Sequence, residues 1–302
     1  NRALDSRLMK MQRQGRLGFY LTSTGEEGTI IGAANCLNEN DPIYIQYREL
    51  GCILWRNVPL DKILNQYLGN HKDTSKGRQM PVHYAYKEYH IPSVSSPVGT
   101  QFPQACGHAY ACQLQQTGQI TLAFCGEGTA SGNDFHSALN FAGVLNAPVI
   151  FIIRNNGYAI STPESKQTAA KNLACRAEGY GIPGYQIDGN DLLAVIDTMN
   201  TAIKRARNQE GPTLIEAMTY RFEGHSSSDD PSVYRPEKEV ELWKPHDVLK
   251  RTIQHAQWRN CWEKGSEEKL LIKYDKKIED LFETQEKLSK PRITSLFEDV
   301  YA

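Results

Sequence analysis

Residues 120–158 read ITLAFCGEGTASGNDFHSALNFAGVLNAPVIFIIRNNGY and contain the clearest fold signal of the chain. This stretch begins with a short apolar run at Ile120 to Phe124, and a second apolar run follows at Val149 to Ile153. Between these runs, His136 to Leu145 has apolar residues at helical spacing. Short apolar, β-branched runs on either side of a helix are typical of buried parallel strands in a βαβ unit. The stretch therefore predicts a strand, a turn, a helix and a second strand.

Elements of the same two kinds continue outward from this unit. The further predicted elements are strands at Ile43 to Ile45 and Thr213 to Ala217, and helices at Leu4 to Met11, Leu192 to Ile203 and Leu271 to Phe282. They predict an α/β fold with a mainly parallel sheet flanked by helices on both faces. The last helix packs either on the domain surface or against a partner, because amphipathicity does not distinguish the two. Gly224 to Pro236, rich in Ser, Asp and Pro, predicts a long loop, and such loops are often functional.

The composition argues against several classes of protein. The 302 residues include 34 Lys plus Arg and 35 Asp plus Glu, which gives a net charge of -1. This balance argues against nucleic acid or a membrane surface as a partner. The most strongly apolar stretch, Ala147 to Ile153, is far shorter than the roughly 18 residues of a membrane helix, so we expect no membrane insertion. The seven cysteines contain no Cys-x-x-Cys pair, which favours a reducing compartment over a disulfide scaffold.

A polar turn follows each strand of the central unit. Gly126-Glu127-Gly128 follows the first strand, where glycines let backbone amides approach a phosphate while a carboxylate projects forward. Alone it is a weak signal, because α/β proteins need glycine at tight turns. The second strand ends in Arg154-Asn155-Asn156-Gly157-Tyr158. Together the turns would offer the Glu127 carboxylate, the Asn156 amide oxygen and a backbone carbonyl near Tyr158, which are hard oxygen ligands of the kind that Mg²⁺ requires. The arginine of the second turn would supply a cation for a diphosphate.

The pair of turns resembles the thiamin-diphosphate signature, Gly-Asp-Gly followed by Asn-Asn, with Glu127 in place of the usual Asp. The resemblance covers nearly the whole chain, and the other stretches that carry it are Gly25-Glu26-Glu27-Gly28, Gln46-Tyr47-Arg48-Glu49, Gly77 to His83, Ser95-Ser96-Pro97 and Gly224-His225-Ser226 through Tyr234-Arg235. The chain resembles the α subunits of the E1 component of branched-chain 2-oxoacid dehydrogenase complexes. This resemblance implies one thiamin-diphosphate-binding domain over residues 1–302, with a helical extension from about residue 237.

The resemblance also implies the cofactors and the residues that hold them. The expected cofactors are thiamin diphosphate, Mg²⁺ and K⁺, with Glu127, Asn156 and the carbonyl of Tyr158 as the Mg²⁺ ligands. The positions that match cofactor-binding residues are Tyr47, Arg48, Ser96, Val98, Glu127, Gly128, Thr129, Arg154, Asn156, Tyr158, Ile160 and His225. The positions that match the K⁺ site are Ser95, Pro97, Thr100 and Gln101, which offer hydroxyls, an amide and a carbonyl.

The activity that the resemblance implies is oxidative decarboxylation of branched-chain 2-oxoacids, such as 3-methyl-2-oxobutanoate, and reductive acylation of a lipoyl group. His225 is the expected catalytic residue, as a proton donor or positioner in the acylation. The partners would be an E1 β subunit, in an α2β2 tetramer, and the lipoyl-bearing E2 acyltransferase. The chain shows no candidate for the carboxylate that activates the cofactor, so the β subunit would supply it. The location would be the mitochondrial matrix in a eukaryote and the cytoplasm in a bacterium.

Ser226 matches a regulatory phosphoserine, which implies a kinase and a phosphatase as further partners. A phosphate there would place about two negative charges beside the cofactor site. Pro236 stands where the family has its second phosphosite, so only one site is expected. Alternatively, Ser226 and its neighbours only keep the loop soluble.

Other interpretations stay open at this stage. His83 and His225 could be ordinary loop histidines, and Arg48 could form a structural ion pair with Glu49 or Asp41. A pyruvate dehydrogenase E1 α subunit would share the cofactor site, although 78–83 and 226–235 favour the branched-chain class. A dinucleotide-binding dehydrogenase lacks support because the third glycine of its fingerprint is missing. A catalytically silent scaffold would require lost ligands.

Overall fold

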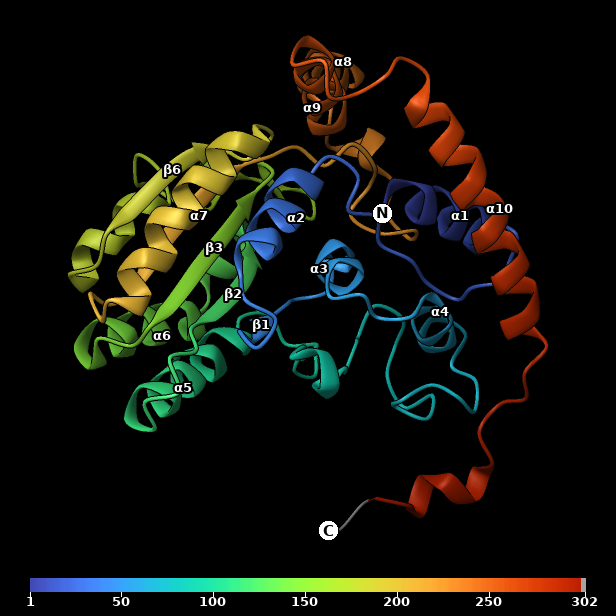
Figure 1. Ribbon diagram of the computed structural model, residues 1–302, viewed down its shortest axis with the longest axis horizontal. Coiled ribbons are helices and arrows are strands. Elements are labelled where there is room, and N and C mark those ends of the chain that lie inside the picture. Colours follow the sequence, from blue (N-terminus) through green and yellow to red (C-terminus); the bar gives the residue numbers. More distant parts are fainter. Residues whose placement is uncertain (300–302) are drawn as a thin grey trace.

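A parallel five-stranded sheet forms the centre of the molecule. The structure is a computed structural model that describes residues 1–299 (Figure 1). The strands are β1 (Ile43–Tyr44), β2 (Thr121–Gly126), β3 (Val149–Asn155), β6 (Gly184–Asp188) and β7 (Thr213–Met218). They lie in the order β1-β2-β3-β7-β6, and every neighbouring pair is parallel. The predicted parallel sheet is therefore confirmed, and β6 is an additional edge strand.

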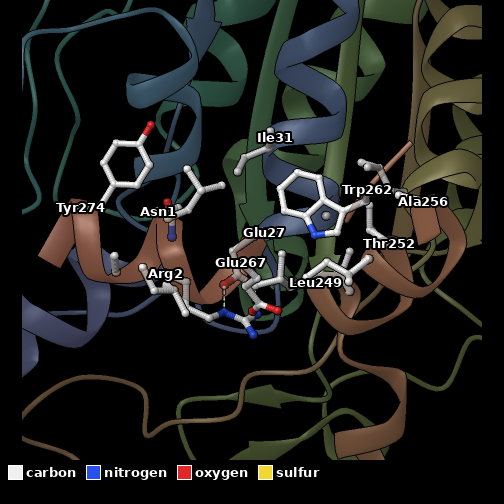
Figure 2. Close-up of a pocket in the computed structure, with 17 residues that line it drawn as sticks. Asn1, Arg2, Glu27, Ile31, Leu249, Thr252, Ala256, Trp262, Glu267 and Tyr274 are labelled. Carbon is white, nitrogen blue, oxygen red and sulfur yellow. Dashed lines mark hydrogen bonds and ion pairs between the residues drawn. The ribbon is translucent and has the colours of Figure 1, made fainter. Parts of the chain in front are cut away.

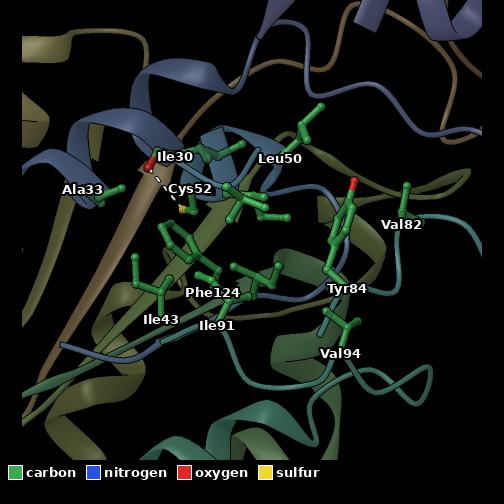
Figure 3. Packing of buried hydrophobic residues seen from close by; sticks show 14 of the residues in the cluster. Ile30, Ala33, Ile43, Leu50, Cys52, Val82, Tyr84, Ile91, Val94 and Phe124 are labelled. Atoms are coloured by element: carbon green, nitrogen blue, oxygen red, sulfur yellow. Dashed lines mark hydrogen bonds between the residues drawn. The ribbon is translucent and has the colours of Figure 1, made fainter. Parts of the chain in front are cut away.

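Helices cover both faces of the sheet because side chains alternate along each strand. On one face, Leu122 and Phe124 of β2 pack in a core with α2 (Glu27–Cys36) and α7 (Leu192–Arg207). On the other face, Ala123 and Cys125 pack with α5 (Gln101–Leu114) and α6 (Asn133–Leu145). Figure 3 shows Phe124 among side chains of α2 and of the segments that follow it. The α/β class with helices on both faces is confirmed.

Four helices extend the core on the α2 side, namely α1 (Arg2–Arg13), α3 (Leu50–Trp55), α4 (Leu60–Leu68) and α10 (Ser266–Glu286). Two more helices, α8 (Glu237–Trp243) and α9 (Val248–Trp258), lie outside this core. The long helix α10 runs beside α1 and α4 and buries Ile278 and Phe282 against them (Figure 1). Of the two places expected for this amphipathic helix, the structure shows packing on its own chain.

Short elements connect these parts. The 3₁₀ helices are η1 (Lys87–Tyr89), η2 (Glu127–Ser131), η3 (Glu164–Lys166), η4 (Ala174–Tyr180), η5 (Pro231–Val233), η6 (Lys244–His246) and η7 (Ile293–Phe297). A small antiparallel hairpin joins β4 (Tyr158–Ala159) to β5 (Thr162–Pro163). The predicted loop at 224–236 is irregular apart from η5. Within residues 1–299, no helix has both the length and the apolar character needed to cross a membrane.

The register of the sheet brings three strand ends together. Gly126 at the end of β2 pairs with Arg154 of β3, and Arg154 pairs with Ala217 of β7. The turns that follow these three strands therefore start at one edge of the sheet. In open α/β sheets, the crevice at the carboxyl ends of the strands is where ligands bind.

Candidate active site

A cleft of about 340 Å³ lies at this carboxyl edge. It is lined by Gln46, Tyr47, Arg48, Val98, Gly126, Glu127, Gly128, Thr129, Arg154, Asn156, Tyr158, Ala159, Ile160, Arg221 and His225. The structure thus brings together all of the predicted cofactor-binding residues except Ser96. It also includes Gly126 of the predicted phosphate-binding turn, and it adds Gln46, Ala159 and Arg221, to which the sequence assigned no cofactor contact.

Glu127 is the first residue after β2 and is almost fully buried, with 2% of its surface exposed. Burial raises the pKa of this carboxyl to about 6. The backbone N–H of Asn156 donates to Oε2 of Glu127 at 3.3 Å. In the described part of the chain no Lys, Arg or His lies within 4.0 Å of this carboxylate. A buried carboxylate without an ion-pair partner is costly, and a bound cation would relieve that cost.

The amide of Asn156 has a fixed orientation. Its Nδ2 donates to Oε1 of the buried Glu26 at 3.1 Å, and its Oδ1 accepts from the backbone N–H of Tyr158 at 3.2 Å. The amide oxygen is therefore turned away from Glu26 and keeps a second lone pair. Residues behind a ligand commonly orient it in this way. The donor set of Glu127 and Asn156 fits Mg²⁺.

Buried arginines converge on the floor of the cleft around Glu26. The Arg154 guanidinium pairs with Glu26 and lies 2.5 Å from Oε1 of Glu49. The Nε of Arg48 lies 3.6 Å from Oε1 of Glu26. Burial opposes ionisation of Glu26, but Arg154 and Arg48 hold its pKa below the ordinary value. The structural ion pair considered for Arg48 thus forms with Glu26, and the two partners suggested by the sequence are not the ones it takes.

Arg221 is a third buried arginine of the cleft, and sequence reasoning assigned it no role. It follows β7, and its Nη2 donates to the carbonyl of Ile160 at 3.0 Å and to the hydroxyl of Tyr234 at 2.9 Å. Its Nη1 lies 3.5 Å from the carbonyl oxygen of Tyr158. A signal for Arg221 was present, because the strand at 213–217 was predicted and residues after parallel strands share one edge.

His225 lies in the long loop and closes one side of the cleft. Its carbonyl accepts from Nη2 of Arg48 at 2.9 Å, and its backbone N–H donates to Oδ2 of Asp229 at 2.5 Å. Its ring meets Tyr47 edge to face, with centroids 6.1 Å apart. Burial, with Arg48 and Arg221 nearby, lowers the pKa of His225 to about 4. The imidazole is therefore neutral near pH 7.

The cleft wall contains one close approach of the backbone, at Gly128, and one strained residue, Ile160. A Cβ on Gly128 would lie 2.6 Å from the Cβ of Ala159, so only glycine fits between η2 and the hairpin. Ile160 has a φ of 57°, a left-handed conformation that is strained for a β-branched residue. Its carbonyl is the one that Arg221 holds. Strained residues of this kind cluster at functional sites.

The loop at 95–101 places Val98 in the lining of the cleft, whereas Ser96 lies outside that lining. The Thr100 hydroxyl donates to the Pro97 carbonyl at 3.1 Å, and the backbone N–H of Gly99 donates to Oε1 of Gln101 at 3.1 Å. Pro97, Thr100 and Gln101, three of the four predicted K⁺ positions, thus have oxygens on one turn, which fits an all-oxygen site. Within residues 1–299, the side chain of Ser95, the fourth position, makes no hydrogen bond. That part of the chain contains no cluster of three or more His, Cys, Asp or Glu that could hold a metal ion. The expected Mg²⁺ site has a single carboxylate, Glu127, beside an amide and a carbonyl oxygen, and the expected K⁺ site has only hydroxyl, amide and carbonyl oxygens.

Ser226 is half-buried beside His225, and its hydroxyl accepts from the backbone N–H of Ser228 at 3.2 Å. The neighbouring Ser227 holds the loop in place. Its backbone N–H donates to the carbonyl of Tyr20 at 2.8 Å, and its hydroxyl accepts from the Tyr20 N–H at 3.1 Å. The loop that carries Ser226 is therefore attached to the segment before α2.

A second cavity, of about 350 Å³, lies between the start of α1, α2, α9 and α10 (Figure 2). Its walls are mainly apolar, and they include Ile31, Leu249, Ala256 and Trp262. The charged groups at its edge include Arg2, whose Nε lies 2.8 Å from Oε1 of Glu27. None of the predicted site residues lines this cavity.

Comparison with known proteins agrees with this geometry. Residues 1–294 match the dehydrogenase E1 component family. The chain is 44% identical, over 299 residues in each case, to the 2-oxoisovalerate dehydrogenase subunit alpha, mitochondrial, of Bos taurus, Mus musculus and Homo sapiens. The matches cover 99% of this chain and 66%, 68% and 67% of these relatives. The chain thus spans about two thirds of the length of the relatives it matches.

These relatives favour the branched-chain 2-oxoacid class over pyruvate dehydrogenase, and they confirm the resemblance found in the sequence. The matched family covers both polar turns and the long loop, which together build the cleft. The chain therefore belongs to the dehydrogenase E1 component family, whose members depend on thiamin diphosphate.

Proposed function

We propose that this chain is the α subunit of a branched-chain 2-oxoacid dehydrogenase E1 component. It would take part in the oxidative decarboxylation of substrates such as 3-methyl-2-oxobutanoate and in the reductive acylation of a lipoyl group on an E2 acyltransferase. The observation that carries the proposal is the cleft that holds a buried carboxylate, Glu127, with no ion-pair partner within residues 1–299, together with the oriented amide of Asn156 and three buried arginines. Residues 1–302 would form one cofactor-binding domain, with a helical extension from about residue 237.

The residues present fit thiamin diphosphate with Mg²⁺. Glu127, Asn156 and the carbonyl of Tyr158 would hold Mg²⁺, and Arg48, Arg154, Arg221 and His225 would face the diphosphate. Tyr47, Val98, Gly128, Thr129 and Ile160 would line the rest of the cofactor site, with Ser96 at its rim. Ser95, Pro97, Thr100 and Gln101 would hold K⁺. When bound, thiamin diphosphate supplies the carbanion chemistry of decarboxylation, and the protein binds and orients it.

His225 would be the catalytic residue of this chain. Nη2 of Arg48 lies 3.4 Å from its Nδ1, which favours the tautomer with the proton on Nε2. With its pKa lowered to about 4, the ring is neutral near pH 7, and its Nε2–H can donate to the lipoyl group and position it for the acylation. It would also help to bind the diphosphate through its N–H.

The partners follow from what the cleft lacks. No carboxylate for cofactor activation is assigned in this chain, so an E1 β subunit would supply it in an α2β2 tetramer. The lipoyl-bearing E2 acyltransferase would approach the loop that carries His225. A kinase and a phosphatase could act on Ser226, where a phosphate would lie near Asp229 and Asp230 and would loosen the loop by repulsion. The location would be the mitochondrial matrix in a eukaryote and the cytoplasm in a bacterium.

The test is a binding and turnover experiment on the chain assembled with its β subunit. Calorimetry is expected to show thiamin-diphosphate binding that requires Mg²⁺, and turnover is expected to be faster with 3-methyl-2-oxobutanoate than with pyruvate. The α chain alone is expected to be inactive. A preference for pyruvate would favour a pyruvate dehydrogenase subunit, and turnover by the α chain alone would contradict the role of the β subunit.

A further inference from the structure

His83 and Ser96 form a hydroxyl–imidazole pair beside the cleft. Nε2 of His83 lies 2.8 Å from Oγ of Ser96, and Nδ1 of His83 lies 3.1 Å from the carbonyl oxygen of Pro81. Because a carbonyl can only accept, Nδ1 carries a proton, and in the neutral imidazole Nε2 is then the acceptor. The Ser96 hydroxyl therefore donates to His83, and its lone pairs remain for other donors. His83 is 8% exposed, whereas Ser96 reaches the surface.

A buried glutamine holds the turn that carries His83. Gln66 of α4 is 1% exposed, its Nε2 donates to the carbonyl of Met80 at 2.7 Å, and its Oε1 accepts from the N–H of Val82 at 3.0 Å. Val82 has a φ of 66°, a conformation that is strained for a β-branched residue. The turn keeps this strain because Gln66 is bonded to it on both sides of Pro81. The imidazole is thus aimed from a fixed backbone.

The loop at 95–101 is held at its two ends. At one end Ser96 donates to His83, and at the other Nε2 of Gln101 donates to the carbonyl of Phe124 on β2 at 2.7 Å. Between these ends lies Val98, which lines the cleft although 52% of its surface is exposed. Gln101 thus attaches the loop to the sheet, and His83 attaches it to the α4 side of the molecule.

We propose that His83 is a positioning residue of the cofactor site, an inference that rests on the proposed function. By accepting the Ser96 proton it fixes the loop that places Val98 against the cleft. Because the proton of the Ser96 hydroxyl is donated to His83, this hydroxyl can only accept a hydrogen bond from a bound molecule. An N–H donor, such as the amino group of the cofactor's pyrimidine, would be a suitable partner. His83 acts through Ser96 and touches no reacting atom.

The test uses the assembled complex and four variants. His83→Leu removes the acceptor while it preserves bulk, and His83→Gln restores an acceptor oxygen near the position of Nε2. Ser96→Ala removes the donor, and the double variant His83→Leu/Ser96→Ala closes a double-mutant cycle. Ser93→Ala is the matched control, because Ser93 is exposed and its hydroxyl makes no hydrogen bond within residues 1–299.

Loss of a residue behind a ligand typically lowers affinity about 10-fold or more. His83→Leu is therefore expected to weaken thiamin-diphosphate binding roughly 10-fold, with a smaller change in kcat at saturating cofactor. His83→Gln is expected to recover part of that affinity, and the double variant to be no weaker than Ser96→Ala. The proposal would be overturned if the losses of thiamin-diphosphate affinity in His83→Leu and Ser96→Ala added up in the double variant. It would also be overturned if His83→Gln bound the cofactor as weakly as His83→Leu.

A second measurement needs no cofactor. Hydrogen exchange of the amides at 95–101 is expected to be faster in His83→Leu than in wild type and unchanged in Ser93→Ala. If the wild-type complex fails to bind thiamin diphosphate, the proposed function is wrong, yet exchange still reports whether His83 holds the loop. Unchanged exchange in His83→Leu would overturn the positioning role even if the cofactor binds.

Discussion

The cleft at the sheet edge and the cavity between α1, α2, α9 and α10 have nearly the same volume, about 340 and 350 Å³, but opposite chemistry. The cleft brings together the buried side chains of Arg48, Arg154, Arg221, Glu26, Glu49 and Glu127. The cavity is walled mainly by apolar side chains, with its charges at the edge (Figure 2).

The difference shows that size does not identify a site. Replacing a buried ion pair by apolar residues is often neutral or stabilising, so ionised groups gathered in one place are weakly explained by stability alone. An apolar cavity of equal volume needs no such explanation, because gaps between helices arise wherever side chains fit imperfectly. Substitutions in the two regions are therefore expected to differ in their effects on stability and on cofactor binding.

Glu26→Gln is expected to have the largest effect. It removes the charge that pairs with Arg154 and Arg48, and breaking a buried pair costs about 3–5 kcal/mol. Urea unfolding of the variant measures this loss. The matched control is Glu267→Gln at the edge of the apolar cavity, where we expect a change within about 0.5 kcal/mol. Equal losses of unfolding free energy in the two variants would show that charges in the cleft and at the apolar cavity contribute alike to stability.

Glu127→Gln separates cofactor binding from stability. The substitution keeps the shape but removes the charge that we assign to Mg²⁺, so thiamin-diphosphate affinity is expected to fall roughly 100-fold or more. Because burial raises the pKa of Glu127, ionising this group disfavours the folded state, and the neutral variant is expected to be no less stable than wild type. Calorimetry with and without Mg²⁺, together with urea unfolding, measures both quantities. Wild-type affinity in the variant would mean that Glu127 is not a ligand.

The pH dependence of stability tests the electrostatic environment of His225. Its folded pKa of about 4 lies below the ordinary value of 6.5, so between these values the unfolded state binds more protons and stability falls as the pH decreases. From pH 7 to pH 5 this contribution is about 2 kcal/mol. His225→Gln is expected to lose less stability than wild type over that range, as measured by urea unfolding. Parallel pH profiles for the two proteins would show that Arg48, Arg221 and burial do not depress this pKa.

Ala256→Leu probes the apolar cavity and is expected to have the smallest effect. The larger side chain would enter the cavity from α9 and fill part of it, and filling a cavity commonly stabilises a protein by about 0.5–2 kcal/mol. Thermal unfolding measures this gain. Thiamin-diphosphate affinity is expected to stay within about twofold of wild type, since the cavity and the cleft share no lining residue. A large loss of affinity would link the two regions.

The sequence predicts the part of the cleft that follows directly from strands and the turns after them. Short apolar runs mark β2 and β3, and because parallel strands end at one edge, Glu127 and Asn156 could be expected to meet there. The edge strand β6 was missed because its residues alternate between half-buried and exposed, so it has no continuous apolar run. Arg221 lies three residues beyond the end of β7, where no motif marks it, although it shares the same edge of the sheet.

Glu26 and Ser96 show where sequence reasoning stops. Glu26 contacts Arg154, 128 residues further along the chain, and it lies in a segment without strand or helical periodicity, so nothing local marks it as the group that orients Asn156. Ser96 matches a cofactor-binding position, yet its hydroxyl turns to His83. Both placements depend on contacts between distant segments, which spacing along the chain does not encode.

The packing of α10 against α1 has a consequence for how the protein is made. Arg7 pairs with Glu279 at 3.1 Å, and Phe282 is fully buried in the core that α1 shares. During synthesis α1 leaves the ribosome long before its partner exists, since 272 residues separate Arg7 from Glu279. Contacts of such long range form slowly. The side of α1 that packs on α10 therefore stays uncovered through most of translation, and this part of the nascent chain is exposed to aggregation until α10 arrives.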